Sequence, residues 1–191
     1  ARPSVAAGAV PVSIANLHAS GTSTNAASFT TASMSFVAGR HYIVTAVWND
    51  AGAINTTLRI ALSTSSGMTF VDATCPGSTD GSFFDRAGAT RRGDSFIGYC
   101  GSNTSGTLTF TPDAGIHTSG FGDIEVIVDE ISNAHVGSDA NDCLVQCVRL
   151  DTSTNATSQT TKIGDFTDAT NNAGYIVMTN AVDQVQNWTG P

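Results

Sequence analysis

Apolar and polar residues alternate with a period of two along several segments of the chain, as they do in β-strands. Segment 41–48 is also predicted to be a strand, although its even-numbered residues from Tyr42 to Trp48 and its odd-numbered residues are both fairly apolar. A strand with two apolar faces suits the interior of a sandwich. In 106–111, Leu108 and Phe110 are expected to point inward and the threonines outward. Further strands are predicted over 57–63, over 124–129, over 144–150, over 175–179 and over 29–36, where Phe29 and the following odd-numbered residues would share a face.

Turn-forming residues separate these strands at short intervals. Gly, Asn, Asp and Ser gather at 49–52, 65–67, 80–81, 114–115 and 171–172. No window of helical length shows a convincing 3.6-residue period. The pattern predicts an all-β fold with about 8–10 strands, a two-layer, jelly-roll-like β-sandwich. We expect one domain over residues 1–191, with an extended N-terminal arm over 1–24 and a long functional or mobile loop over 72–94.

Composition narrows the function classes. Charged residues make up 13% of the chain, against about 25% in ordinary soluble domains. Threonine occurs 26 times and serine 20 times, so small hydroxyl groups replace charge as the main polar surface. The net charge of −8 disfavours a nucleic-acid partner, which needs clustered Lys and Arg. No run approaches the ~18 apolar residues of a membrane-spanning helix, so no membrane contact is expected.

Four cysteines leave the redox state open. A disulfide between Cys75 and Cys100 would close the long loop. In the chain-entropy model, closing a loop of this length stabilises the folded state by roughly 3 kcal/mol. Cys143 and Cys147 are four residues apart, about 13 Å on a strand, which is too far for one bridge. Buried free thiols are an equally good interpretation. A zinc site is the weakest alternative, because two closely spaced Cys pairs are absent.

Catalytic motifs are absent from the sequence. The four histidines are scattered, and neither a GxSxG nor a phosphate-binding GxxxxGK[ST] pattern occurs. Carboxylates gather at Asp123, Glu125, Asp129 and Glu130, but a solvated strand face explains them better than a glycosidase pair does. Acidic residues around 72–94 lack the calcium-loop spacing. We therefore expect no enzyme activity, no catalytic residue, no cofactor and no metal.

Exposed aromatic side chains are the best candidates for contacts with partners. Phe83 and Phe84 are adjacent in a polar loop, so an extended backbone could not bury both in one core. Together with Trp188 they are predicted to form a subunit interface. Packing of these side chains in the core of their own domain is an equally good interpretation. Sugar binding by these residues, or by Trp48 and Tyr99, is a further alternative. The Arg-Gly-Asp tripeptide at 92–94 matches an integrin-binding motif, but three-residue matches often arise by chance.

The order of several short motifs resembles a family of β-sandwich virion proteins of tailed bacteriophages. Each motif is weak alone, and the resemblance rests on their order over about 150 residues. The long loop and the four cysteines depart from the pattern. The segments that carry the resemblance are Asn-Ala-Ala-Ser-Phe-Thr-Thr-Ala at 25–32, the strand at 42–47, Gly-Met-Thr-Phe-Val at 67–71, Ser-Gly-Thr-Leu-Thr-Phe at 105–110, the strand end at 128–134, Val-Gln at 145–146 with the hydroxyl-rich stretch 151–161, and Asp-Phe to Asn-Asn-Ala-Gly-Tyr at 165–175.

The resemblance implies a structural protein of the virion, assembled in the host cytoplasm. Its role would be that of a capsid decoration (cement) protein or of a head or tail appendage subunit. Its partners would be the major capsid protein or tail proteins, and other copies of the chain, with a trimer favoured. The alternative is a carbohydrate- or receptor-binding module of a tail fibre or adhesin, which would contact a cell-surface glycan. The resemblance carries over no catalytic residue.

Overall fold

The computed structural model describes residues 12–22, 26–50, 60–74, 84–85, 91–112, 121–134 and 138–144. Regular structure in these ranges is almost entirely antiparallel β-strand, arranged in stacked layers. The predicted all-β sandwich is therefore confirmed, whereas the jelly-roll topology stays a prediction. The described residues form eleven strands rather than about 8–10, because several of them are only two or three residues long.

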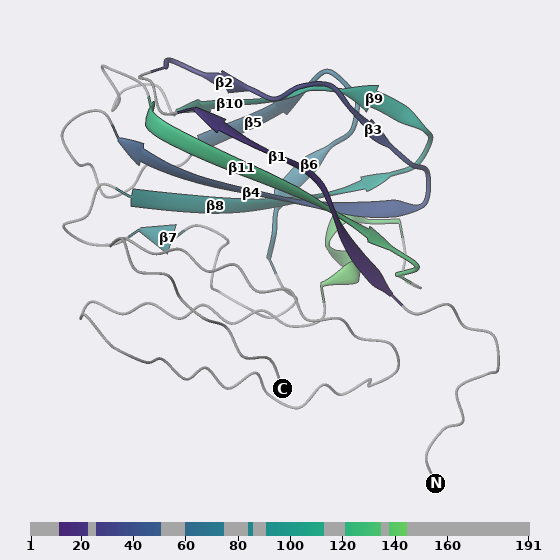
Figure 1. Cartoon of the computed structure of the whole chain (residues 1–191). Helices are drawn as coiled ribbons and strands as arrows, with labels where there is room; N and C mark the ends of the chain where they lie inside the picture. The colour runs from purple at the N-terminus through teal and green to yellow at the C-terminus, as the bar shows by residue number, and fades with distance from the viewer. Residues whose placement is uncertain are drawn as a thin grey trace, which may run out of the picture.

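One layer is a single large sheet. Its strand order is β1 (Ser13–Thr22), β11 (Phe121–Ser132), β4 (Arg40–Asp50), β8 (Arg91–Cys100) and β6 (Phe70–Asp72), with β7 (Phe84–Asp85) also paired to β8. Figure 1 shows β4, β8 and β11 running alongside one another through the middle of the molecule. These three strands are ten to twelve residues long, so most of the sandwich is built on this sheet.

The opposite layer is built from short strands. It consists of the sheet β2 (Phe29–Thr30), β10 (Leu108–Pro112) and β5 (Ile60–Thr64), and of the pair β3 (Met34–Phe36) and β9 (Thr104–Gly106). We call these five strands the small layer. In Figure 1 the small layer lies above the large sheet.

Alternating residues of both layers fill the core between them. The inward residues of β4 are the predicted even-numbered ones, and Tyr42, Val44 and Trp48 are essentially unexposed. Phe36 of the small layer meets Tyr42 edge-to-face, with ring centroids 4.9 Å apart, which is a favourable aromatic geometry. Leu108 and Phe110 are fully buried, as their alternation predicts. The rest of this buried cluster is Met34, Ala46, Ile60, Phe96, Cys100, Phe121, Ile124, Val126 and Val128.

The outer face of the large sheet carries a second, smaller apolar cluster. Ile43, Ile97 and Ile131 come from three neighbouring strands and are buried there. The 3₁₀ helix η1 (Ala140–Cys143) packs on them through Ala140 and Cys143, together with Leu144. Chain segment 138–144 therefore covers this part of the sheet.

Segment 29–36 differs from the single strand that the alternation predicts. Phe29 packs against the core, but Met34 and Phe36 are buried there as well while Ser35 is exposed. The residues that face the core change from odd-numbered in β2 to even-numbered in β3, because β2 pairs with β10 whereas β3 pairs with β9. Thr31 lies at the crossing and exchanges hydrogen bonds with the backbone of Leu108.

Two predicted irregular regions contain strands. Residues 13–22, expected in an N-terminal arm, form β1 and pair with β11. Within the expected loop 72–94, Asp72 ends β6, Phe84–Asp85 is β7, and residues 91–94 begin β8. The estimated distance from Cys143 to Cys147 assumes a strand, but Cys143 belongs to η1 instead. Residues 145–191, with the strand predicted at 175–179, lie outside the described residues.

Candidate interaction surfaces

Charged side chains are segregated between the two layers. The described segments that build the small layer, 26–39, 60–69 and 101–112, contain no Asp, Glu, Lys or Arg. The charged residues of the described chain belong instead to the large sheet and to segment 138–144. Because the protein carries a net charge of −8, its two faces differ in electrostatic potential, and the small layer is the neutral one.

Small hydroxyl side chains cover the outer surface of the small layer. The Thr30 and Thr109 hydroxyl oxygens are 3.0 Å apart across β2 and β10. The Ser65 hydroxyl accepts a hydrogen bond from the Thr107 amide at 2.9 Å and lies 3.2 Å from the Thr107 hydroxyl. We call this surface the hydroxyl face, made of Thr30, Ala61, Ser63, Ser65, Thr107, Thr109 and Thr111, which share one side of the paired strands.

The hydroxyl face is suited to packing against another flat surface. Threonine is stiff at χ1, and short side chains lose less rotamer freedom on ordering than Lys or Glu do. Several of its hydroxyl groups already hold one another through cross-strand hydrogen bonds, so they are partly ordered before any contact. Its remaining donors and acceptors are available to a partner.

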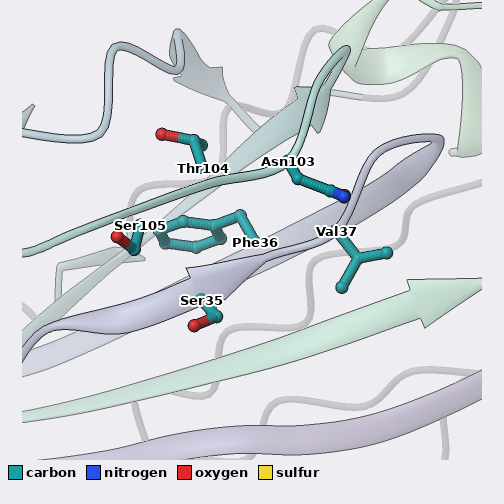
Figure 2. A pocket seen from close by; sticks show the side chains of 6 residues that line it. All are labelled: Ser35, Phe36, Val37, Asn103, Thr104 and Ser105. Carbon is teal, nitrogen blue, oxygen red and sulfur yellow. The ribbon is translucent and has the colours of Figure 1, made fainter.

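A shallow hollow of about 430 Å³ lies beside this face, where β3 and β9 pair. Figure 2 shows its six lining residues, with the Asn103 amide beside Val37. The Asn103 side-chain oxygen accepts a hydrogen bond from the Ala38 amide at 2.8 Å, and the Thr104 hydroxyl donates to the Ser66 carbonyl at 2.8 Å. The lining contains no titratable group: Ser35, Phe36, Val37, Asn103, Thr104 and Ser105. The hollow can therefore hydrogen-bond a neutral ligand, but it offers no acid or base.

Three of the four clustered carboxylates make structural contacts, and the fourth, Glu125, is exposed. Asp123 accepts hydrogen bonds from the Asn49 amide at 3.0 Å and from its side chain at 2.8 Å. Asp129 accepts a bond from the Asn16 side chain at 3.0 Å. Glu130 lies on the opposite face of β11 from both, because the side chains of a strand alternate. The residues that the sequence groups together thus do not converge as a facing catalytic pair.

Glu130 belongs to a partly buried polar group at one end of the sandwich. It forms an ion pair with Arg40 and accepts a hydrogen bond from the Tyr42 hydroxyl at 2.9 Å. The Tyr42 oxygen also accepts a bond from the Val37 amide at 2.7 Å. Burial raises the pKa of Tyr42 to about 12, so its phenol remains protonated at neutral pH. This group ties β4 and β11 to the chain that leaves β3.

The predicted interface residues lie largely beyond the described chain. Phe83 and Trp188 are outside it, and only the backbone of Phe84 is described, in β7 opposite Gly93. Of the alternative sugar-binding aromatics, Trp48 is buried in the core, which rules it out as an exposed platform, and Tyr99 is half-buried with its ring 5.0 Å from that of His41.

The cysteine and Arg-Gly-Asp predictions concern β8. Cys100 is buried with its Sγ atom 3.1 Å from the Ser102 carbonyl oxygen, and burial raises the pKa of its thiol. Cys75 lies outside the described residues, so the bridge between them stays a prediction. Gly93 and Asp94 are buried within β8, which is incompatible with an accessible integrin-binding loop.

The described residues contain neither a metal-binding cluster nor a membrane-spanning helix. No group of three or more His, Cys, Asp or Glu side chains there could hold a metal ion. No helix of that part of the chain is long and apolar enough to cross a membrane.

Sequence reasoning placed three threonines of the hydroxyl face correctly but missed the neutrality of the whole layer. Thr111 is exposed, and Thr107 and Thr109 are half-exposed, as the alternation of 106–111 predicts. The available signal was the lack of charge in three separate segments, which becomes a surface property only when the strands are assigned to layers.

Comparisons with models of protein families, with curated proteins and with solved structures found no significant match.

Proposed function

We propose that the protein acts by binding and assembly, as a structural subunit of a tailed-phage particle. Its role would be to decorate the capsid or to form a head or tail appendage, as a homo-oligomer for which a trimer is favoured. The observation that carries the proposal is the uncharged hydroxyl face opposite an acidic large sheet. The motif order described above supplies the phage context.

The charge segregation favours assembly through the small layer. Copies with a net charge of −8 repel one another when their acidic surfaces approach, and like charges in contact oppose association. A neutral face avoids this cost. Many copies on one particle then gain avidity from individually modest contacts. Asp123, Asp129 and Glu130 are engaged in structural contacts, which accords with a role that needs no chemistry.

Substitutions on the hydroxyl face test this proposal. Ser63→Glu and Thr111→Glu each add a charge at an exposed position of that face, whereas Ala19→Glu adds the same charge on β1 of the large sheet, where Ala19 is also exposed. Each variant is added to particles lacking the protein, and its occupancy is measured. Ser63→Glu and Thr111→Glu should reduce occupancy at least tenfold, and Ala19→Glu should bind like the unaltered protein. Equal binding by all three variants would refute the assignment.

A glycan- or receptor-binding module is the second candidate, favoured by the hollow at Asn103. Its hydroxyl and amide groups are suited to a neutral polyhydroxylated ligand, although no exposed aromatic ring is found among the side chains that the structure describes. A glycan array with the isolated protein distinguishes the two candidates. Specific glycan binding that is lost in Asn103→Ala would favour the module, and recruitment to particles without glycan binding would favour assembly.

A further inference from the structure

His41 occupies an unusual position on the outer face of β4. Its side chain is only 1% exposed, although histidine is ionisable near neutral pH. Its Nε2 atom lies 3.1 Å from the Asp139 carbonyl oxygen. Its Nδ1 atom is buried, and no hydrogen-bond partner for it is found in the described part of the chain.

This geometry selects the neutral imidazole. A carbonyl can only accept, so Nε2 carries the proton and donates to Asp139. Nδ1 is then an unprotonated acceptor. Protonation would add a buried N–H at Nδ1 for which the described residues offer no acceptor, and burying an unpaired charged donor is costly.

The bond from His41 reaches the segment that covers the outer apolar cluster. Within 138–144, the Asp139 carbonyl also accepts from the Asp142 amide at 3.1 Å, and the Asp142 carboxylate accepts from the Asp139 amide at 3.1 Å. This reciprocal capping fixes the turn that begins η1. Because Ala140, Cys143 and Leu144 pack on the buried cluster, the His41 bond joins the sheet to its cover.

Charged groups around His41 do not offset its burial. Asp142 of η1 favours the protonated ring through its negative charge, and so does the Asp139 carbonyl. On β8, the neighbour of His41 is the Tyr99 ring. On β11, His41 lies opposite Ile131. Asp129 is further along the same outer face of β11, and Glu130 is on its inner face. Arg40 precedes His41 on β4 and pairs with Glu130. Desolvation outweighs these groups and lowers the pKa of His41 below 6.5.

We propose that His41 is a pH-sensitive latch that holds residues 138–144 on the large sheet when neutral and releases them in acid. The neutral ring retains its bond to Asp139, whereas the protonated ring favours conformations in which it reaches water. Release uncovers Ile43, Ile97 and Ile131. Because the pKa is lowered in the folded state, the latch is fully stable above pH 6.5 and weakens as the pH falls below that value.

Hydrogen exchange of the full-length protein tests the latch. Exchange of amides in 138–144, corrected for the intrinsic pH dependence, should increase at least tenfold between pH 7.5 and pH 5, while β4 and β11 stay protected. His41→Gln keeps an amide donor but cannot ionise, so its exchange should not change over this range. His18→Gln alters the other described histidine, which lies on β1, and should respond like the unaltered protein.

Two results would overturn the proposal: constant protection of 138–144 down to pH 5, or an unchanged acid response in His41→Gln. Should His41→Gln fail to fold, an NMR titration of the unaltered protein decides instead. The His41 ring must titrate below pH 6.5 together with the Leu144 amide resonance. Independent titration of the two signals would contradict the latch.

Discussion

Replacement of Tyr42 by Phe tests how the two layers are joined. The Tyr42 side chain is unexposed, and its hydroxyl donates to Glu130 at 2.9 Å and accepts from the Val37 amide at 2.7 Å. Tyr42→Phe keeps the ring, and with it the edge-to-face contact to Phe36. It leaves the Val37 amide without its acceptor and one carboxylate oxygen without its donor.

The expected loss follows from these two bonds. A neutral hydrogen bond contributes about 1 kcal/mol and one to a charged group about 1.5–3 kcal/mol, so the free energy of unfolding should fall by about 2.5–4 kcal/mol. With a urea m-value of about 2–3 kcal/mol/M, the midpoint should fall by about 1 M. Urea unfolding followed by tryptophan fluorescence measures this shift.

Tyr99→Phe is the matched control, because Tyr99 is half-buried on the outer face. Its unfolding free energy should change by no more than about 0.5 kcal/mol, as for ordinary surface substitutions. Equal midpoints for Tyr42→Phe and Tyr99→Phe would refute the role given to the Tyr42 hydroxyl in joining β3, β4 and β11.

Three further predictions concern packing, alkaline pH and thiol reactivity. Gly106→Ala would place a Cβ atom 2.5 Å from the Ser66 backbone nitrogen, so the free energy of unfolding measured by urea titration should fall by about 1–3 kcal/mol. In the control Gly101→Ala, the added Cβ atom would have no neighbour closer than 4.0 Å, so the free energy of unfolding should change little. The pKa of Tyr42 is raised from 10.0 to about 12, so the folded state should lose stability as the pH rises from 10 to 12, a loss that Tyr42→Phe should remove from alkaline melting curves. The buried Cys100 thiol should resist alkylation in the native protein and react in urea without reductant; mass spectrometry showing no labelling in urea would instead support the bridge from Cys100.

The alternation of residues predicted much of the core but not the connections between layers. Leu108, Phe110 and the even-numbered residues from Tyr42 to Trp48 point inward as expected, because a strand buried against a partner layer has a strict period of two. The switch from odd-numbered to even-numbered core residues between Phe29 and Met34 could not be predicted. It arises because the chain pairs with β10 at β2 and with β9 at β3. Such exchanges depend on contacts distant in sequence.

The candidate surfaces were less predictable than the core. Asp129 and Glu130 are adjacent in sequence, yet one bonds Asn16 on the outer face and the other bonds Arg40 and Tyr42 toward the core. The burial of His41 depends on segment 138–144, almost one hundred residues later. These relations follow from strand order and from long-range packing, which local patterns do not encode.

Electron cryomicroscopy of particles purified from the phage proposed to encode this chain decides whether the protein is a virion subunit. We expect many copies at regular positions on the head or tail, with the neutral hydroxyl face against the particle or against neighbouring copies and the acidic large sheet turned away. Absence of the protein from the particle, or contact made through the large sheet with the hydroxyl face exposed to solvent, would contradict the proposed function.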